Sequence, residues 1–599
     1  MSNSARNSLL IALFLLAVPV MNFGQAASGT PPFSDITGSP DKVDLGNLNV
    51  HMDFPVFNKN GRGLPFSFGL GNDSSLWVPV ASGSSTFWEP LNTFGWVGSG
   101  TNIGTIGYTL ITGAGFFEYC FFTYFDGFGT AHVFPGCAAV SGGVDFPLQT
   151  TTLDGSGYAL AADACGILQN NTCFLVFTLT TVDGSSIIPQ NATPVNGGSG
   201  AASGSIIDRN GNQITANTNG TFTDTLGTIA LTNTGGFPPN PNNLNPPPAP
   251  SPYVMSYTSP AGTAASATLT YRLYRLESNF GCSGIVEFGQ STSYQNYFPD
   301  RITLADGSFY QFTYEPTPGF PSSITGRLAS ITLPTGGRIT YTYSGGHNGI
   351  FCSDGSTAGV TRTTPDGTWT YSRTQGSGAA STTTVTDPQG NQTVIQFQGI
   401  FETQRKSYQG NSSTGTLLQT TNTCYNGAAV PCTATAITLP IASKKVVTQA
   451  GTSTQQSQKT FSYNSTYGVP LEEDDYDFGP GAPGALLKKT VFTYASLGNV
   501  HSKPKTVTIY GTGTTPVAQT TYGYDETAVT ATNGTPQHVN IGAAVRGNVT
   551  STTSLVQGTA TLRKTTTYFD TGNPNVQTDV NGAQTTYAYG TGSCGNSFP

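Results

Sequence analysis

The densest group of residues that could do chemistry is a run of carboxylates over residues 472–477 (EEDDYD). Calcium prefers crowded oxygen ligands, so Asp474, Asp475 and Asp477 are candidate calcium ligands. The run lacks the loop frame and the terminal Glu of an EF-hand, and a solvated acidic loop is the favoured interpretation. We therefore expect no resident metal and no cofactor.

Sequence motifs for catalysis are missing. The five histidines lie far apart and show neither H-x-x-x-H nor H-E-x-x-H spacing for a metal. No mature serine occupies a G-x-S-x-G elbow, and no G-x-x-x-x-G-K-[ST] phosphate loop occurs. A glycosidase pair of distant carboxylates leaves no motif to find. The sequence therefore predicts a non-catalytic protein, with a carbohydrate-active enzyme as the least favoured alternative.

Aromatic side chains offer a binding chemistry instead. Trp77, Trp88 and Trp96 lie in glycine-rich sequence and are candidate ligand aromatics that could stack on sugar rings. Tyr341 and Tyr343 are two residues apart, so they point to one face of a strand and could do the same. Packing in the core is the favoured alternative for both groups, because such aromatic stripes usually pair across strands.

Charge is scarce along the whole chain. Its 599 residues include 24 Lys or Arg and 32 Asp or Glu, which makes 9% charged residues, against roughly 25% in ordinary soluble domains. Scattered basic residues and a net charge of −8 argue against a nucleic-acid binder. An aromatic content of 11% argues against disorder. Abundant Gly beside scarce Lys, Glu and Arg excludes a coiled coil or helical bundle.

The N-terminus has the pattern of a secretory signal peptide over residues 1–27. Arg6 supplies the positive charge, residues 9–20 the apolar core and residues 24–26 (GQA) a small-x-small cleavage site. The apolar core is too short to span a bilayer, and no later stretch is long and apolar enough. We expect a secreted or cell-surface protein with no transmembrane segment in the mature chain.

Nine cysteines suit an oxidising compartment, and they contain no C-x-x-C pair of the kind used by zinc sites. Short turn-rich loops predict three disulfides, of which the last is the least certain: Cys165–Cys173, Cys424–Cys432 and Cys120–Cys137. Three cysteines have no obvious local partner, namely Cys282, Cys352 and Cys594. The odd total requires at least one free thiol or a partner outside this chain.

Hairpin turns are the main structural signal. Asp-Gly and Asn-Gly dipeptides separate runs rich in Thr, Tyr, Val, Ile and Phe, and they tolerate the positive φ of tight hairpin turns. Four of these turns have an even spacing, because Gly127, Gly155, Gly184 and Gly211 are separated by 28, 29 and 27 residues. The sequence predicts an all-β protein made of antiparallel hairpins.

Longer repeats accompany the turns. Residues 302–314 and 331–343 share the frame I-T-L-x-x-G-x-x-x-x-[FY]-T-Y at an offset of 29 residues. Single hairpins cannot bury a face alone, so we expect them to stack into a long sheet. We predict four parts, namely a signal peptide (1–27), a β-rich region (28–234), a Pro/Asn-rich linker or loop (235–252), with a domain boundary favoured there, and a hairpin repeat array (253–599).

The stretch 565–589 (TTTYFDTGNPNVQTDVNGAQTTYAY) closely resembles the YD repeat of RHS-family proteins. Phe569 replaces the Tyr of the family motif. Residues 522–525 and 326–328 are similar to further copies, and residues 43–70 resemble the opening of many RHS chains. The remaining motif positions are Tyr568, Asp570, Gly572, Asn573, Asp579, Gly582, Tyr587 and Tyr589.

The resemblance implies a long β-sheet that spirals into a hollow shell. Such shells enclose a C-terminal toxic domain or serve as surface and adhesion structures. The family's block with self-cleaving aspartates is not found, and no toxin domain follows. We therefore expect the chain to be the front portion of a longer protein, with an uncapped, adhesive strand at 585–589.

The leading hypothesis is a non-catalytic exported scaffold or shell, similar to RHS/YD-repeat proteins, which is a surface structure or encloses a cargo encoded downstream. The alternative from a different class is a secreted carbohydrate-binding or adhesion protein that grips cell-surface glycans through Trp and Tyr. No nucleic-acid partner is expected.

Overall fold

The computed structural model describes residues 36–37, 41–100, 103–127, 129–169, 172–189, 203–237, 245–542, 544–558 and 560–589. Within these ranges the elements are β-strands, apart from one 3-10 turn, η1 (Asn92–Gly95). The predicted all-β class is therefore confirmed. The expected signal peptide and Cys594 lie outside the described residues.

One sheet of 30 strands makes up most of the described chain, and each strand pairs antiparallel with the next in sequence order. Its strands are β13 (Leu148–Thr151), β14 (Ala159–Gln169), β15 (Thr172–Thr180), β16 (Ser186–Ile188), β17 (Gly204–Ile207), β18 (Gln213–Ala216), β19 (Thr221–Thr223), β20 (Ile229–Thr234), β21 (Tyr253–Thr258), β22 (Ala264–Leu276), β24 (Gln295–Thr303), β25 (Phe309–Thr317), β26 (Phe320–Thr332), β27 (Arg338–Tyr343), β28 (Gly359–Thr364), β29 (Gly367–Gln375), β30 (Ala380–Thr386), β31 (Gln392–Gln398), β32 (Phe401–Gln409), β33 (Thr416–Tyr425), β34 (Ser443–Ala450), β35 (Gln455–Tyr463), β36 (Pro470–Pro480), β37 (Leu486–Tyr494), β38 (Pro504–Tyr510), β39 (Pro516–Tyr524), β40 (Val549–Gln557), β41 (Ala560–Tyr568), β42 (Pro574–Thr578) and β43 (Gln584–Thr586).

Three smaller sheets come mostly from the N-terminal part of the chain. The first contains β1 (Ile36–Thr37), β2 (Asp41–Asp44), β3 (Val50–Lys59), β4 (Phe66–Asp73) and β7 (Trp96–Gly100). The second contains β8 (Thr105–Gly113), β9 (Phe116–Phe125), β10 (Ala131–Val133), β11 (Cys137–Ser141) and β12 (Val144–Phe146). The third contains β5 (Trp77–Ser82), β6 (Ser85–Pro90) and β23 (Ile285–Val286).

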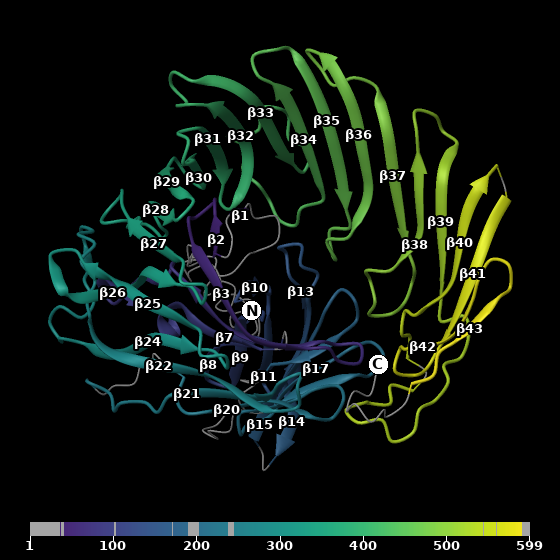
Figure 1. Cartoon of the computed structure of the whole chain (residues 1–599), viewed down its shortest axis with the longest axis horizontal. Coiled ribbons are helices and arrows are strands. Elements are labelled where there is room, and N and C mark those ends of the chain that lie inside the picture. Colours follow the sequence, from purple (N-terminus) through teal and green to yellow (C-terminus); the bar gives the residue numbers. More distant parts are fainter. Residues whose placement is uncertain are drawn as a thin grey trace, which may run out of the picture.

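The large sheet curls round the first of these smaller sheets. Its strands follow a ring from β14 and β15 at the bottom, past β22 and β26 and over the top at β33 to β36, down to β42, while β2 and β3 lie inside (Figure 1). Phe54 of β3 packs on Tyr310 and Phe312 of β25, with ring centroids 5.2 and 5.0 Å apart. Asp41 of β2 accepts two hydrogen bonds from Arg362 of β28, at 2.5 and 2.6 Å. The core therefore lies on the inner face of the sheet.

Several hairpin turns share one local structure, which follows from an Asp-x-x-Gly sequence. Asp208, Asp224, Asp387 and Asp579 each accept hydrogen bonds from the backbone N–H groups two and four residues later, at 2.8 to 3.1 Å. The glycine three residues after each Asp has φ between +77° and +91°, which other residues adopt at a cost. The sequence thus sets both the position and the geometry of these turns.

A tyrosine hydroxyl ties the two strands of successive hairpins together. In the last part of the sheet, a Tyr that ends the second strand donates to the carbonyl oxygen of the residue that begins the first strand. The pairs are Tyr494 to Pro470 (2.7 Å), Tyr524 to Pro504 (2.7 Å) and Tyr568 to Val549 (2.8 Å). This recurrence explains why Tyr stands at the same place in each unit.

The Pro/Asn-rich segment 235–252 connects two neighbouring strands of the large sheet. β20 and β21, which flank the segment, pair antiparallel from Thr232 to Thr234. β20 and β21 are therefore consecutive strands of one sheet, and the domain division predicted at this segment stays a prediction.

Candidate functional site

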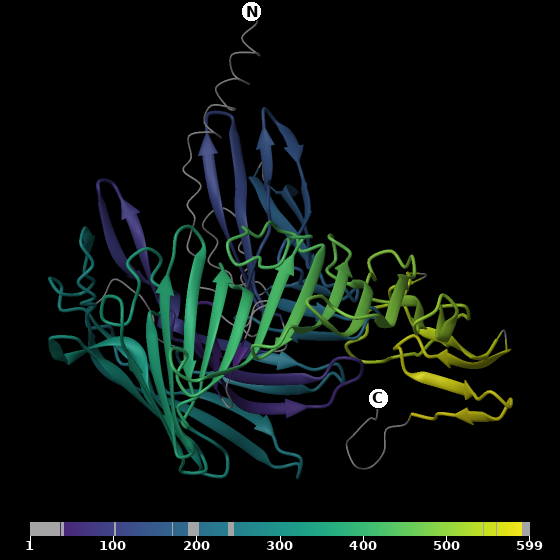
Figure 2. The same ribbon diagram turned by 90° about the horizontal axis from the view of Figure 1, so that it is seen from above.

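The feature of this fold with the clearest functional meaning is the contact between its two ends. The turns that follow β13, β15, β17 and β19 meet the turns and loops that follow β35, β37, β39 and β41. We call this contact the seam. It joins segments about 300 residues apart in the sequence, and Figure 2 shows the yellow last strands beside the lower blue and purple ones.

The first two contacts of the seam are close approaches of backbone. Gly157 after β13 lies against the carbonyl of Tyr467, so that a Cβ atom at position 157 would be 2.8 Å from that oxygen. The carbonyl of Val182 after β15 accepts hydrogen bonds from the N–H groups of His501 and Ser502, at 2.9 and 3.1 Å. The His501 ring stacks on Tyr467 with centroids 3.6 Å apart, which links the two contacts.

The third contact is a short stretch of β-pairing. Gln213 N–H donates to the Gln537 carbonyl at 2.9 Å, and Val539 N–H donates to the Gly211 carbonyl at 2.8 Å. The amide of Asn212 also donates to the Thr571 carbonyl at 2.8 Å. The seam thus satisfies polar groups of Asn212, which is fully buried.

Two buried arginines hold this part of the seam together. Arg62 donates to the Asn212 side-chain oxygen and to the Pro536 carbonyl, both at 2.6 Å. Arg546 donates to the carbonyls of Asn210 and Asp570, at 3.2 and 2.9 Å. Burial lowers the pKa of both guanidinium groups, while nearby carboxylates such as Asp570 oppose that effect. Both groups stay charged, and hydrogen bonds to a charged donor are the stronger kind.

The Asp208 carboxylate shapes the turn that enters the seam. Burial raises its pKa, and hydrogen bonds from Asn212 and Asn210 act in the opposite direction. Its second oxygen accepts from the Asn212 side chain at 2.8 Å, which orients that side chain toward Arg62. Three of the evenly spaced glycines in the sequence lie in the seam, namely Gly155, Gly184 and Gly211. The residues that they contact on the other side of the seam, Gly468, Val500 and Val539, are not evenly spaced.

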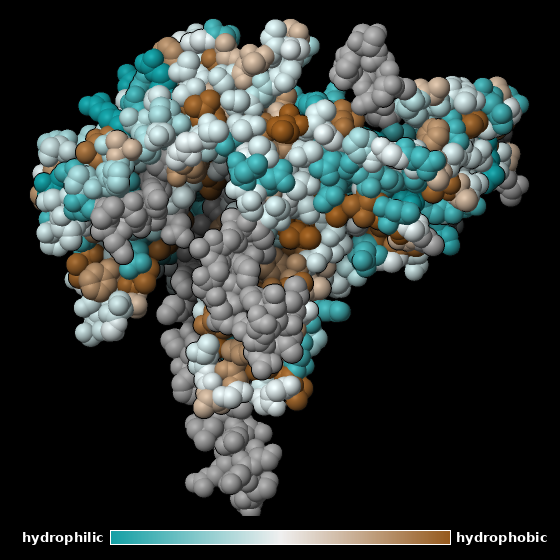
Figure 3. Space-filling view, turned by 90° about the horizontal axis from the view of Figure 1, so that it is seen from below, coloured by the Kyte–Doolittle hydropathy of each residue, from teal (hydrophilic) through white to brown (hydrophobic). Residues whose placement is uncertain are grey.

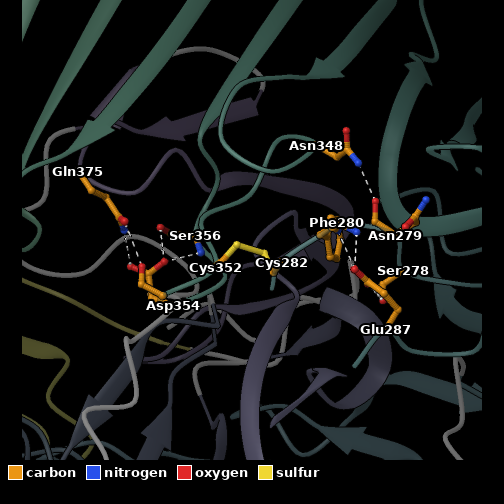
Figure 4. The surroundings of a disulfide bond; sticks show 12 residues. Ser278, Asn279, Phe280, Cys282, Glu287, Asn348, Cys352, Asp354, Ser356 and Gln375 are labelled. Carbon is orange, nitrogen blue, oxygen red and sulfur yellow. Dashed lines mark hydrogen bonds between the residues drawn. A yellow bond between two sulfur atoms is a disulfide. The ribbon is translucent and has the colours of Figure 1, made fainter. Parts of the chain in front are cut away.

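The structure contains the three disulfides expected from the cysteine spacing, Cys120–Cys137, Cys165–Cys173 and Cys424–Cys432. It also contains a fourth, Cys282–Cys352, whose 70-residue separation gave no local signal. Figure 4 shows it between two loops that are braced on either side by Glu287, which accepts from Phe280 N–H at 2.8 Å, and by Asp354, which accepts from Ser356 N–H at 2.9 Å. Four disulfides are typical of proteins from an oxidising compartment.

The tryptophans are not a surface binding platform, and the candidate ligand role is wrong. Trp77, Trp88 and Trp96 are 0%, 1% and 0% exposed. Trp77 and Trp88 pack on Phe280, and the Trp77 N–H donates to the Thr325 carbonyl at 2.9 Å. A glycine-rich environment here means close packing of backbone, because a Cβ atom at position 355 would overlap the Trp77 carbonyl. Tyr341 and Tyr343 are also buried, as the core alternative has it.

The acidic run forms a strand, so the interpretation as a solvated loop is wrong. Residues 472–477 lie within β36, where alternate side chains face opposite sides of the sheet. Asp474 is buried, while Asp475 on the other face pairs with Lys459 and Lys488 at 2.8 and 3.1 Å. Asp474, Asp475 and Asp477 therefore cannot converge on one calcium ion. Cross-strand lysines explain the charge of the run.

Among the described residues, two groups bring together three potential metal ligands. One contains Cys282, His347 and Cys352, and the other contains Glu118 with Cys120 and Cys137. In both groups the cysteine sulfurs are bonded to each other, so they offer no thiolate to a metal.

The YD-like motif residues lie at the end of the sheet, from β41 to just past β43. Tyr568 ties the last hairpins, and Asp570 accepts a hydrogen bond from the Thr532 hydroxyl at 2.6 Å. A Cβ atom at Gly572 would overlap the Asn210 side chain of the seam. The Asn573 carbonyl completes the same turn by accepting a hydrogen bond from Phe569 N–H. Asp579 and Gly582 form the next turn. Tyr589, which follows Tyr587 by two residues, packs its ring on Phe569.

No protein-family model matches this chain, and no curated protein matches it. Three crystal structures show a distant likeness of shape. One is TcdB2-TccC3 without hypervariable C-terminal region, with 9% identity and a TM-score of 0.27, in which the match covers 97% of this chain and 28% of that chain. The others are TcdB2-TccC3-Cdc42 and TcdB2-TccC3, with 9% and 10% identity and TM-scores of 0.21, covering 87% and 92% of this chain and 26% and 28% of those chains. At these scores the likeness establishes neither family nor function.

Within the described residues, no helix is long and apolar enough to cross a bilayer.

Proposed function

We propose that this chain is a non-catalytic scaffold, similar to RHS/YD-repeat proteins, whose spiralling sheet forms part of the wall of a hollow shell. The seam carries the proposal. A sheet that serves only as a flat platform has no need to bring turns about 300 residues apart into contact, whereas a wall must close on itself. The repeated Asp-x-x-Gly turns and Tyr-to-carbonyl bonds support the likeness to YD repeats.

The role that follows is enclosure of a polypeptide cargo after export. The signal-like N-terminus and the disulfides support export. The cargo is proposed to be a segment encoded beyond this sequence, held inside the wall away from proteases. The buried tryptophans offer no surface for stacking on a glycan.

The proposal is tested by protease protection of the protein from its natural host, with every segment that accompanies it. We expect a cargo segment that resists proteinase K in the native particle and is digested after Arg546→Ala, which loosens the seam. Arg563→Ala is the matched control, since Arg563 forms an exposed ion pair with Glu526 and, in the described contacts, donates no hydrogen bond to the turns after β13, β15, β17 and β19. If no segment depends on the seam for its protection, the enclosing role is wrong.

A further inference from the structure

The sheet formed by β8 to β12 projects from the ring (Figure 2, blue), and three large apolar side chains near its far end are exposed. Its two hairpin turns lie side by side at the far end, since Gly142 N–H donates to the Gly115 carbonyl at 3.0 Å. Beside the turns, Phe116, Val144 and Phe146 are 36%, 56% and 52% exposed. In Figure 3 the same projection points downward and carries brown, apolar surface.

These three side chains share one face of the small sheet. Phe116 pairs with Ser141, which pairs with Val144, and Glu118 pairs with Ala139, which pairs with Phe146. Residues that pair directly, or that are two apart on a strand, point to the same side. We call this side the blade face. The opposite side packs on the large sheet, where Tyr108 and Phe122 contact Phe177.

A disulfide cross-links the blade face, and the strand register fixes the order of its side chains from the tip. The Cys120–Cys137 disulfide joins the two hairpins on the same face. Phe116 and Val144 form the outermost row, and Glu118 and Phe146 form the next row on this face. With about 3.4 Å per residue along a strand, the Glu118 carboxylate row lies roughly 7 Å behind the outermost row.

The strands that form the blade face contain no Lys or Arg, and Glu118 lies on this face. The sequence has no Lys or Arg between Arg62 and Arg209, although nine Asp and Glu occur there. An apolar tip with the Glu118 carboxylate behind it complements a lipid surface whose outermost charge is a quaternary ammonium. Anionic headgroups would be repelled, and a protein partner would need a groove shaped to the projecting turns.

We propose that the blade face docks on a lipid surface of zwitterionic phosphatidylcholine type, with Phe116 and Val144 at the acyl boundary. Apolar groups of interfacial proteins enter a bilayer by about 5–10 Å, a depth that leaves Glu118 at headgroup level. The proposal is independent of the seam and of the enclosed cargo. It would attach an exported shell to a membrane surface.

The test is sedimentation of the full protein with vesicles of pure phosphatidylcholine and of equimolar phosphatidylcholine and phosphatidylglycerol. We expect binding to the first, weaker binding to the second, and a loss of about tenfold or more for the triple variant Phe116→Ser, Val144→Ser, Phe146→Ser. The matched control is Val517→Ser, Val556→Ser, Leu562→Ser, whose residues are 66%, 58% and 48% exposed on β39 to β41. It should bind as the unchanged protein does.

Circular dichroism and recovery of the Cys120–Cys137 peptide check that the triple variant folds, and Val144→Asp alone offers a milder change at an exposed position. Equal binding by the folded triple variant, or no binding by the unchanged protein, overturns the proposal. So does light scattering that shows a dimer of the unchanged protein and a monomer of the triple variant, because the face would then be an interface between copies.

Discussion

Removal of the Arg62 side chain should open the seam without unfolding the sheet. Arg62 is 7% exposed and donates to Asn212 and to Pro536 at 2.6 Å. Hydrogen bonds to a charged group contribute about 1.5–3 kcal/mol each, so loss of the two bonds in Arg62→Ala should lower the free energy of opening the seam by about 3–6 kcal/mol. The loss stays local, because Arg62 donates no side-chain bond to the middle of the large sheet in the described contacts.

Hydrogen exchange measures this opening at two amides. In the described part of the chain, Gln213 N–H and Val539 N–H donate across the seam, to the carbonyls of Gln537 and Gly211. Since about 1.4 kcal/mol is a factor of ten, their protection should fall by about a hundredfold to ten-thousandfold in Arg62→Ala. Arg563→Ala should change it by less than about fivefold, because exposed ion pairs contribute about 0–1 kcal/mol. Unchanged protection of both amides in Arg62→Ala would refute the role of Arg62 in closing the seam.

Three further outcomes are expected. Replacing Cys282 and Cys352 by Ser should cost about 4 kcal/mol of unfolding free energy on the chain-entropy estimate, measured by guanidinium denaturation, and a cost below about 1 kcal/mol would contradict that loop-closure reasoning. Trp77→Ala should lose about 3–5 kcal/mol by the same measurement and leave glycan-array signals unchanged; weaker glycan binding at full stability would restore the ligand role. Burial tends to lower the pKa of His132, but hydrogen bonds and charge interactions with Asp126 and Asp154 outweigh it and raise the pKa to about 9. The protonated histidine therefore stabilises the fold fully below its ordinary pKa of 6.5, and this stabilisation is lost as the pH rises through about 9. The unfolding temperature should therefore fall between pH 6.5 and 9, and less so in His132→Gln; parallel profiles would contradict the shift.

Local structure was predictable from the sequence wherever one short segment decides it. The turn at Asn210 follows from the Asn-Gly dipeptide, and the Cys165–Cys173 bond follows from a short loop. The prediction of a solvated loop at residues 472–477 was wrong, because the lysines that neutralise Asp475 lie on the two neighbouring strands. A charge pattern on one strand is interpretable only once its cross-strand partners are known.

Long-range structure was not predictable in the same way. The even spacing of three glycines was visible in the sequence, but it does not predict that Val500 or Gln537 lies on the other side of the seam. Glycine-rich sequence around Trp77 equally fits an exposed loop and a close-packed core. Only the path of the sheet, which brings residue 355 over Trp77, decides between them.

A disulfide across the seam tests the closed wall most directly. A Cβ atom at position 184 would lie 3.5 Å from the Cβ of Val500, within the range of roughly 3.5–4.5 Å that disulfides require. Gly184 has a φ of +87°, so Cys at this position costs about 1–2 kcal/mol. The double variant Gly184→Cys, Val500→Cys should still give a linked peptide pair in non-reducing peptide mapping of the exported protein. Two free thiols at these positions in the folded protein would mean that the ends of the sheet do not meet, and the closed wall would be wrong.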